Sequence, residues 1–427
     1  MIALIARRAF SGGGGGGLSS AKLSLLPDSA LMPLKRDGLV PVAELAEHRE
    51  RGGVERIKLP LGVRAWLITG YEEAKAVLGG TAAFSNDFRQ LAGVAGFDAD
   101  QDPGGLGFSD PPQHTRLRRV LTPEFTGRRL SRLAPRIEGI VTETIDALVT
   151  ATEPVDLVAA FALPIPSLSI CELLGVPYAD REDFQRLSTA RFDMLEGAEA
   201  SLAAVNDSLP YLRGIVEAQR REPGEGLLGR LVRDHGDEFT DQELAGLADG
   251  LLTGGLETTT SMLALGTVLL LQDPAAMALL RDEESATNGA VDKFVEELLR
   301  YLTVVQVAFP RFAREDIEIG GTLIERGDVV VCSLTGANRD ARLGADMETF
   351  DPHRGSVHHV AFGFGIHRCV GAELAKIELR AAFPALVRRF PDMKLAVAPE
   401  ELSYRKRSIV HGIDRLPIDL GAPADLG

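Results

Sequence analysis

Cysteine and tryptophan are scarce in this chain of 427 residues, which contains three cysteines and a single tryptophan. Cys171, Cys332 and Cys369 form an odd and sparse set. Such a set provides no disulfide framework and is typical of a reducing compartment. We therefore expect a cytoplasmic protein, and a chain of this length can bury a large apolar core.

Positive charge is also in deficit. The chain has 46 Lys and Arg residues against 61 Asp and Glu residues, which gives a formal net charge of -15 at pH 7. Nucleic acid is therefore excluded as the main partner, because phosphate binding needs a basic surface. No uninterrupted apolar run approaches the ~20 residues of a membrane-spanning helix. The sequence thus predicts no nucleic-acid partner and no membrane span, and we expect a monomer.

Overall composition is ordinary for a soluble globular protein, with 45% hydrophobic and 25% charged residues. A glycine run from Gly12 to Gly17 follows an apolar start that is too short for a secretory signal. Glycine runs are flexible, so we expect residues 1–20 to form a flexible Gly-rich tail. Later Gly/Pro clusters are loop-sized, and residues 21–427 are predicted to form one domain.

Helical patterns dominate from Pro112 onward, and short strand patterns occur at Arg64–Thr69 and Val329–Cys332. The longest predicted helix begins at a capping box formed by Thr240 to Glu243 and ends at Asp273-Pro274. About 33 apolar-rich residues span roughly 50 Å, so this helix is expected at the centre of the fold. We predict a mainly α fold with small β elements.

The middle of that helix breaks the local rules. Gly254 and Gly255 are adjacent, and Glu257 places a charge in an apolar rod. Each glycine costs ~1 kcal/mol against alanine in a helix interior. Such local violations often mark functional sites.

Cys369 lies in a glycine-rich loop that precedes a predicted helix from Ala372 to about Phe390. Gly363 and Gly365 permit tight turns with positive φ. The N–H groups and the dipole at a helix start favour a thiolate. A single thiolate in such a loop suits the axial position of a haem, where it favours O–O bond cleavage.

Three other interpretations of this loop stay open on the residues alone. Cys369 as a buried structural thiol is the simplest. A zinc site is the second, because His358, His359, His367 and Cys369 are suitable ligand types, but the spacing lacks a paired CxxC or HxxxH element. Phosphate binding by the Gly-x-Gly spacing is the third, and no strand-to-helix fingerprint surrounds it.

The full run Phe362-Gly-x-Gly-x-His-x-Cys369-x-Gly resembles the haem-binding loop of the cytochrome P450 family, in its soluble bacterial form. The resemblance extends from about Arg64 to Ile418. It implies a single-domain cytochrome P450 fold, mainly α with small β-sheets, a long central helix and a Cys-ligand loop. It also implies haem b as the cofactor, with the Cys369 thiolate as the ligand of the iron.

Other matches to the family assign roles to further residues. Gly254 to Thr258 resemble the oxygen-activating helix, which makes Glu257 and Thr258 the catalytic acid and alcohol that organise proton delivery. Behind the cysteine loop, the resemblance implies a structural triad of Glu297, Arg300 and Arg354. The implied cofactor contacts are His114, Arg118, Arg311, Phe362, Gly363, His367, Cys369 and Gly371.

Four of these contacts are cationic and would pair with the two haem propionates: His114, Arg118, Arg311 and His367. Arginine suits carboxylates because its fork is planar and always charged. His114 and Arg118 lie one turn apart in a predicted helix. We expect Asp110 as the N-cap of that helix and Pro111 as its first residue.

The family's chemistry needs two electrons from outside the chain. The chain has no Gly-rich dinucleotide fingerprint and no room for a flavin domain, so a separate ferredoxin and reductase fed by NAD(P)H are implied. We expect an acidic ferredoxin to dock by charge attraction. The expected basic face comprises Arg116, Arg118, Arg119, Arg128, Arg129 and Arg368.

The resemblance places the substrate pocket along segments 84–97, 191–205, 304–309 and 408–410. Its expected apolar lining consists of Gly254, Val304, Val305, Val307 and Ile409, and Gln306 is the obvious polar group. An apolar lining favours a mainly apolar small molecule such as a terpenoid, fatty acid or polyketide.

The resemblance therefore implies a haem-thiolate monooxygenase of bacterial secondary metabolism that inserts one oxygen atom from O2 into a C–H bond. Two alternatives are a peroxide-driven hydroxylase and a non-catalytic haem or ligand-binding protein. Peroxide-driven members of the family typically lack the acid and alcohol pair. Glu257 and Thr258 therefore argue against both alternatives.

Overall fold

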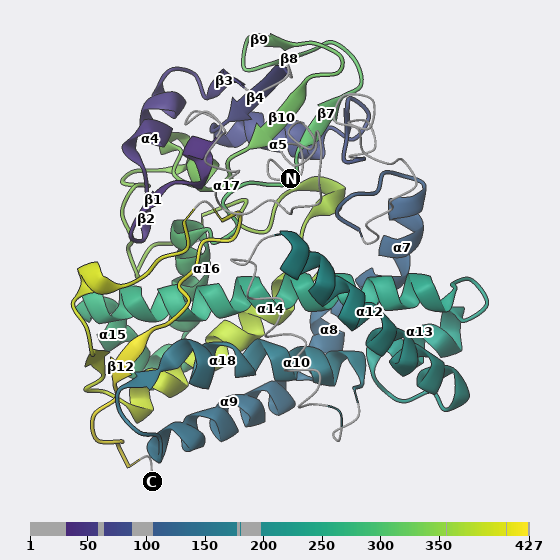
Figure 1. The fold of residues 1–427 in the computed structure, drawn as a ribbon. Helices are drawn as coiled ribbons and strands as arrows, with labels where there is room; N and C mark the ends of the chain where they lie inside the picture. Colours follow the sequence, from purple (N-terminus) through teal and green to yellow (C-terminus); the bar gives the residue numbers. More distant parts are fainter. Residues whose placement is uncertain are drawn as a thin grey trace.

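Helices build most of the protein, and a small sheet covers one end of them. The computed structural model describes residues 31–58, 64–87, 106–176, 180, 198–355, 357–406 and 408–425. The sheet occupies the upper part of Figure 1, and the helices lie beneath it. The expected tail at residues 1–20 lies outside the described residues.

The helix α14 (Asp241–Gln272) runs through the middle of the helical part (Figure 1). It packs against α10 (Pro164–Leu174), α12 (Ala198–Arg221) and α18 (Ala372–Arg389). Every residue from Thr259 to Leu270 is buried. The helix is long and apolar enough to cross a membrane, but 72% of its most apolar window is buried inside the protein. These observations confirm the prediction of a central apolar helix.

Local chemistry sets both ends of α14. The Thr240 side chain accepts a hydrogen bond from the Glu243 backbone N–H, and the Glu243 carboxylate accepts one from the Thr240 N–H. This capping box satisfies N–H groups that the first turn of a helix leaves unpaired. At the other end, Asp273 caps the following helix, α15 (Pro274–Arg281), by accepting from the N–H groups of Ala275 and Ala276.

The main sheet has five strands in the order β3-β4-β10-β7-β5. Strands β4 (Arg64–Ile68) and β10 (Val329–Cys332) pair in parallel, with Ala65 opposite Val329. The other pairs are antiparallel. The strand expected at Arg64–Thr69 is confirmed as β4, and the helix α5 (Tyr71–Gly79) follows it.

The remaining elements surround this framework. On the helical side lie α7 (Gln113–Leu121), α8 (Gly127–Leu130), α9 (Ala134–Val149), the π-helical turn η5 (Val158–Ala162), α13 (Leu227–His235) and α16 (Ala290–Leu302). The main sheet is completed by β3 (Val54–Lys58), β5 (Phe84–Ser85) and β7 (Arg311–Ala313). Near this sheet lie α4 (Ala43–Glu50), the paired strands β8 (Ile317–Ile319) and β9 (Thr322–Ile324), and α17 (Leu334–Ala337). Two small sheets are formed by β1 (Arg36–Asp37) with β2 (Val40–Pro41), and by β11 (Lys394–Leu395), β12 (Pro417–Asp419) and β6 (Val155–Asp156).

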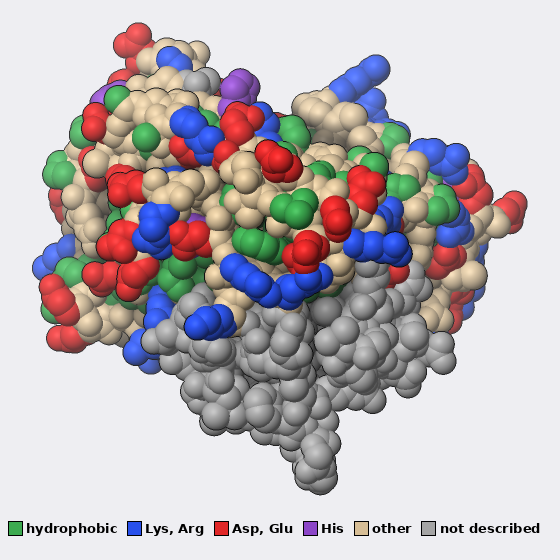
Figure 2. Space-filling view, turned by 90° about the horizontal axis from the view of Figure 1, so that it is seen from above, with side chains coloured by type: hydrophobic (Ala, Val, Ile, Leu, Met, Phe, Trp, Pro, Cys, Tyr) green, Lys and Arg blue, Asp and Glu red, His purple; other side chains and the backbone are tan. Residues whose placement is uncertain are grey.

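Charged side chains of both signs are interspersed over the described part of the face shown in Figure 2. The apolar core beneath is continuous along α9, α14, α16 and α18, where Phe294 and Phe383 meet edge to face. This core fixes α14 and α18 relative to each other, and the two helices carry the candidate site.

Candidate active site

The loop that precedes α18 holds Cys369 through backbone hydrogen bonds. The Cys369 N–H donates to the Phe362 carbonyl at 2.8 Å, and the Gly363 N–H donates to the Val360 carbonyl at 2.8 Å. Gly363 and Gly365 have φ of 72° and 73°, the left-handed region that favours glycine. At Gly365 a Cβ would also lie 2.8 Å from the Leu78 carbonyl oxygen, so no larger residue fits. The loop therefore depends on the glycines that the sequence singled out.

Cys369 is exposed, whereas Cys171 and Cys332 are buried. The surrounding protein raises the pKa of the Cys369 thiol by desolvation, while a Gly371 backbone hydrogen bond and the charges of Arg118 and Arg368 act to lower it. At Gly371 an added Cβ would sit 3.9 Å from the Cys369 Sγ. The Cys369 thiol thus has solvent access, two arginine charges nearby and a glycine beside it, while desolvation still favours its neutral form.

Basic side chains from separate elements converge near this loop. The rings of His114, on α7, and His367 lie 4.3 Å apart. Both nitrogens of the His114 ring are buried and have no hydrogen-bond partner among the described residues. Burial, and then the charges of Arg311 and His114, lower the pKa of His367 to about 3. At a pKa of about 3 the His367 ring is neutral near pH 7. The unpartnered ring nitrogens of His114, beside the charges of Arg118 and Arg311, fit an anionic ligand, and a haem with two propionates supplies one.

Arg118 and Arg311 complete this basic set. Burial lowers the pKa of each guanidinium, and the nearby Cys369 acts to raise that of Arg118. Arg311, on β7, is buried and donates to the Phe309 carbonyl at 2.7 Å. The structure therefore brings all four residues expected for the propionates toward the same region.

Asp110 does not cap α7, and this prediction was wrong. The helix begins at Gln113, its N-cap is Pro112, and no side chain caps it. The Asp110 carboxylate instead accepts hydrogen bonds from the Ser85 hydroxyl, the Asn86 N–H and the Arg314 guanidinium. Long-range partners compete successfully with the local cap because they include a cation.

The helix α14 stays regular through its glycine pair. At Gly255 an added Cβ would lie 2.9 Å from Ile170 of α10, so this glycine permits close helix packing. Gly254 is exposed, and its carbonyl accepts a hydrogen bond of 2.7 Å from the Thr258 hydroxyl. Burial raises the pKa of Glu257, and the charge of Arg405 acts to lower it. The Glu257 carboxyl and the Thr258 hydroxyl are therefore partly buried, and they lie where the central helix passes from exposed Gly254 to the fully buried stretch that begins at Thr259.

Glu297, Arg300 and Arg354 meet behind the cysteine loop. Arg300 donates to both Glu297 oxygens at 2.7 and 2.8 Å, and Arg354 Nε donates to Glu297 Oε1 at 3.0 Å. Arg300 also donates to the carbonyls of Asn338 and Met347. The structure therefore joins α16 to the segment that leads into the cysteine loop.

A cluster of charged and polar side chains near the cysteine loop was not predicted from the sequence. Glu296 of α16 accepts hydrogen bonds from His359 at 3.0 Å and from Lys376 at 2.5 Å. Burial acts to raise the pKa of Glu296, but these two partners outweigh it and hold the pKa at about 2. The Lys376 ammonium also lies 5.7 Å from the ring centre of Phe362, which belongs to the cysteine loop. No signal short of three-dimensional proximity links these residues.

Glu378 is a further residue that the sequence reasoning missed. It is buried on α18, and desolvation raises its pKa to about 8, although the hydroxyls of Ser169 and Thr259 act to lower it. A charged residue on the buried face of an otherwise amphipathic helix was the available signal.

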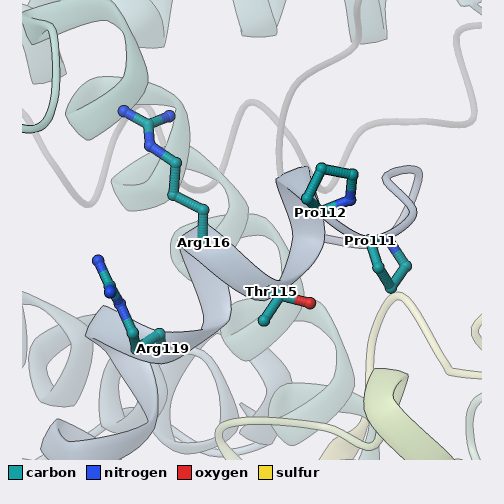
Figure 3. Close-up of a pocket in the computed structure, with 5 residues that line it drawn as sticks. All are labelled: Pro111, Pro112, Thr115, Arg116 and Arg119. Atoms are coloured by element: carbon teal, nitrogen blue, oxygen red, sulfur yellow. The ribbon is translucent and has the colours of Figure 1, made fainter.

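Half of the arginines of the predicted basic face are neutralised by acidic neighbours. Three of its arginines form ion pairs with other elements: Arg116 with Glu243, Arg119 with Glu238 and Arg129 with Glu124. Arg128 and Arg368 are exposed, and Arg118 is half-buried. A shallow pocket on α7 is lined by Pro111, Pro112, Thr115, Arg116 and Arg119, and Figure 3 shows both arginines extending in a similar direction from the helix.

Gln306 is not the polar group of an open pocket, contrary to expectation. It is buried, its amide N–H groups donate to the carbonyls of Leu34 and Ser408, and its oxygen accepts from Arg36. Val304 and Val307 are buried in core clusters, whereas Val305 and Ile409 retain accessible surface. The expected pocket segments at 88–97 and 191–197 lie outside the described residues.

The zinc interpretation gains nothing from the geometry. Across the described ranges, no group of three or more His, Cys, Asp or Glu side chains is arranged to hold a metal ion. His359 is engaged with Glu296 instead of facing Cys369.

Comparison with known proteins yields a consistent result. A sequence profile described as Cytochrome P450 matches residues 48–224 and 226–403. The chain is 38% identical over 383 residues to the cytochrome P450 monooxygenase PikC of Streptomyces venezuelae, covering 88% of this chain and 90% of that protein. It is 40% identical over 372 residues to a vitamin D3 dihydroxylase of Streptomyces griseolus, covering 86% and 90%. The solved structure of P450 StaH, from glycopeptide antibiotic biosynthesis, superimposes with a TM-score of 0.82 at 40% identity, covering 91% of this chain and 99% of that one.

Proposed function

Because this chain belongs to the cytochrome P450 family of monooxygenases, we propose that it inserts one oxygen atom from O2 into a C–H bond of a mainly apolar small molecule. The observation that carries the proposal is the convergence of His114, Arg118, Arg311 and His367 near an exposed Cys369. An oxidoreductase of this family acts with haem, and these residues suit its two kinds of polar group, the iron and the propionates.

Each residue of the set has a distinct task in holding the cofactor. Cys369 would supply the thiolate ligand, and Gly363 and Gly371 keep side chains out of the loop around it. His114, Arg118, Arg311 and His367 would bind the propionates, and Phe362 would pack beside the ring. When bound, haem with a thiolate ligand supplies the chemistry that activates O2.

Glu257 and Thr258 would govern proton delivery. The Thr258 hydroxyl hydrogen is held by the Gly254 carbonyl, which leaves its oxygen lone pairs able to accept a hydrogen bond from a water molecule. Glu257 is partly buried on the same turn, and its carboxylate can take up a proton from solvent and pass it inward. Positioned proton transfer of this kind contributes typically 10²- to 10⁴-fold in rate.

Electrons would come from a separate ferredoxin and reductase that use NAD(P)H. The exposed Arg368 supports docking of an acidic partner near Cys369, and Arg128 is a second exposed arginine of the predicted basic face. The proposed docking surface has fewer available charges than the six arginines predicted from the sequence, because Arg116, Arg119 and Arg129 already pair with carboxylates.

The substrate class follows from the lining residues. Val305 and Ile409 offer aliphatic surface, and the engagement of Gln306 with backbone carbonyls removes a polar group from this part of the lining. A terpenoid, fatty acid or polyketide has the apolar character that such a lining favours.

The ligand assignment is tested by Cys369→Ala. The reduced wild-type holoenzyme with bound CO should show the absorption signature of thiolate ligation, and the variant should lose it. Cys171→Ala, which alters a buried cysteine elsewhere, is the matched control and should retain the signature. A Cys369→Ala protein that kept it would overturn the proposal.

Turnover separates this function from its two alternatives. We expect product only when ferredoxin, reductase, NAD(P)H and O2 are all supplied, with a substrate chosen by screening for a spin-state change. Equal turnover with hydrogen peroxide alone would indicate a peroxide-driven hydroxylase. Binding without turnover under either condition would indicate a ligand-binding protein.

A further inference from the structure

The acid of the central helix is held by an arginine from a distant part of the chain. Glu257 Oε1 lies 3.1 Å from Arg405 Nη1, although 148 residues separate them. The Arg405 side chain is only 5% exposed and that of Glu257 is 17% exposed. The pair is therefore largely shielded from solvent. Opposite charges interact more strongly in such a buried position than at the protein surface.

Backbone contacts fix the position of Arg405 against α14. Its N–H donates to the Gly412 carbonyl at 2.8 Å, and the neighbouring Tyr404 pairs with Ile413 in a β-bridge. An added Cβ on Gly412 would lie 2.6 Å from the Ser261 hydroxyl, one helical turn beyond Glu257. Gly412 thus permits the close approach that brings the guanidinium to the acid.

A second carboxylate shares the same guanidinium. Arg405 Nε donates to Asp414 Oδ1 at 2.6 Å, while Nη1 faces Glu257. Asp414 is 36% exposed, so one member of this chain of charges reaches solvent. The arrangement is Glu257–Arg405–Asp414, with the cation in the middle.

We propose that Arg405 is a positioning residue that holds the Glu257 carboxyl in one orientation and favours its ionised form against the effect of burial, and that Asp414 weakens this hold. The proposal rests on the function proposed above, in which Glu257 takes part in proton delivery. When Glu257 accepts a proton, its attraction to Arg405 falls, and Asp414 remains to balance the guanidinium. Arg405 would therefore stay in place while Glu257 is released and recaptured.

Arg405 and Asp414 have opposite effects on the pKa of Glu257, so their roles can be tested separately. Burial raises the pKa of Glu257, the charge of Arg405 lowers it, and the charge of Asp414 raises it. In the described part of the chain, these are the charged groups that act on Glu257. Removal of the cation and removal of the second anion should therefore shift the pKa of Glu257 in opposite directions.

The experiment compares three variants of the holoenzyme. Arg405→Met removes the cation at similar length, Asp414→Asn removes the second anion without change of shape, and Arg415→Met is the control, since Arg415 is 81% exposed and pairs with Asp156. The Glu257 carboxyl is titrated by infrared difference spectroscopy, with Glu257→Gln as the reference for its band. An opposite charge within ~4–6 Å shifts a carboxyl pKa by roughly 1 to 3 pH units, and that is the rise expected in Arg405→Met.

Asp414→Asn should lower the pKa of Glu257, and Arg415→Met should leave it unchanged. The Asp414 variant keeps the test decisive if Arg405→Met folds poorly, and Arg405→Lys should restore much of the wild-type titration. Shifts in the same direction for both variants, or no shift in Asp414→Asn, would overturn the proposal.

Coupling of NAD(P)H consumption to product measures the proposed function separately. If Glu257→Gln leaves coupling intact while the titrations shift as expected, the assignment of proton delivery is wrong and Arg405 still holds the acid. If Glu257→Gln uncouples turnover but the titrations do not shift, proton delivery stands and the inference about Arg405 falls.

Discussion

Neutralising Glu297 should destabilise the protein far more than neutralising an exposed glutamate. Glu297 Oε1 accepts three hydrogen bonds, from Arg300 Nη2, Arg354 Nε and the Asp351 N–H, and Oε2 accepts one from Arg300 Nε. In Glu297→Gln, the amide oxygen can take the place of Oε1 and keep the three hydrogen bonds that Oε1 accepts. The amide nitrogen then faces Arg300 Nε, so two donors meet and a buried cation loses its counter-charge.

The magnitude follows from the burial of the pair. The side chains of Arg300 and Glu297 are 1% and 2% exposed. Removing one partner of a buried ion pair costs ~3–5 kcal/mol. That is about 100- to several-thousand-fold in the unfolding equilibrium, and a large part of a total stability of ~5–15 kcal/mol.

Urea unfolding of the holoenzyme measures this cost with two probes, helical circular dichroism and the CO spectrum of the thiolate-ligated haem. Arg300 and Arg354 anchor carbonyls at Ala345–Thr349, in the segment that leads to the cysteine loop. The variant should therefore lose the thiolate signature at lower urea than it loses helicity. Glu143→Gln is the control, because Glu143 is 63% exposed and such pairs contribute ~0–1 kcal/mol. A Glu297→Gln cost no larger than that of the control would refute the reasoning.

Three other outcomes are expected. Thr258→Ala should lower product formation roughly 10²-fold or more while NAD(P)H consumption continues, because the variant lacks the hydroxyl that we propose organises proton delivery; full coupling in the variant would contradict this. The pKa of Glu378 is raised from 4.5 to about 8, so the folded state keeps a proton that the unfolded state releases, and stability falls as pH rises through that window. Between pH ~4.5 and the folded pKa of about 8, Glu378→Gln should therefore gain stability over the wild type by ~1.4 kcal/mol per pH unit in urea titrations. Parallel pH profiles of the two proteins would show that Glu378 is ionised when folded. Charge reversal at Arg128 or Arg368 should slow reduction by ferredoxin roughly tenfold at low ionic strength in stopped-flow measurements, and unchanged rates would place the docking surface elsewhere.

Structural features that depend only on residues adjacent in the chain could be predicted from the sequence. The capping box at Thr240 and Glu243 and the stop at Asp273-Pro274 define α14, because helix ends are satisfied by neighbours in the chain. The glycines around Cys369 likewise carry their own geometric reason, since Gly363 and Gly365 need positive φ. These local signals located the central helix and the loop to within a residue or two.

Predictions failed where a distant charge or backbone group outcompeted a local preference. Asp110 was expected to cap α7, but Arg314 and the segment at Ser85 and Asn86 take its carboxylate. Gln306 was expected to face substrate, but carbonyls from two other segments take its amide. A polar side chain goes to the partners that complete its hydrogen bonds, and those partners are set by packing.

The sequence by itself determined the helix and loop that carry Glu257, Thr258 and Cys369, because spacing, capping and glycine conformation are local properties of the chain. Only the tertiary structure decided which charges meet. It joined Arg405 to Glu257 across 148 residues, gave Glu296 its partners His359 and Lys376, and neutralised most of the arginines on and near α7. Electrostatic interaction depends on distance in space and on burial, and neither is readable from separation along the chain.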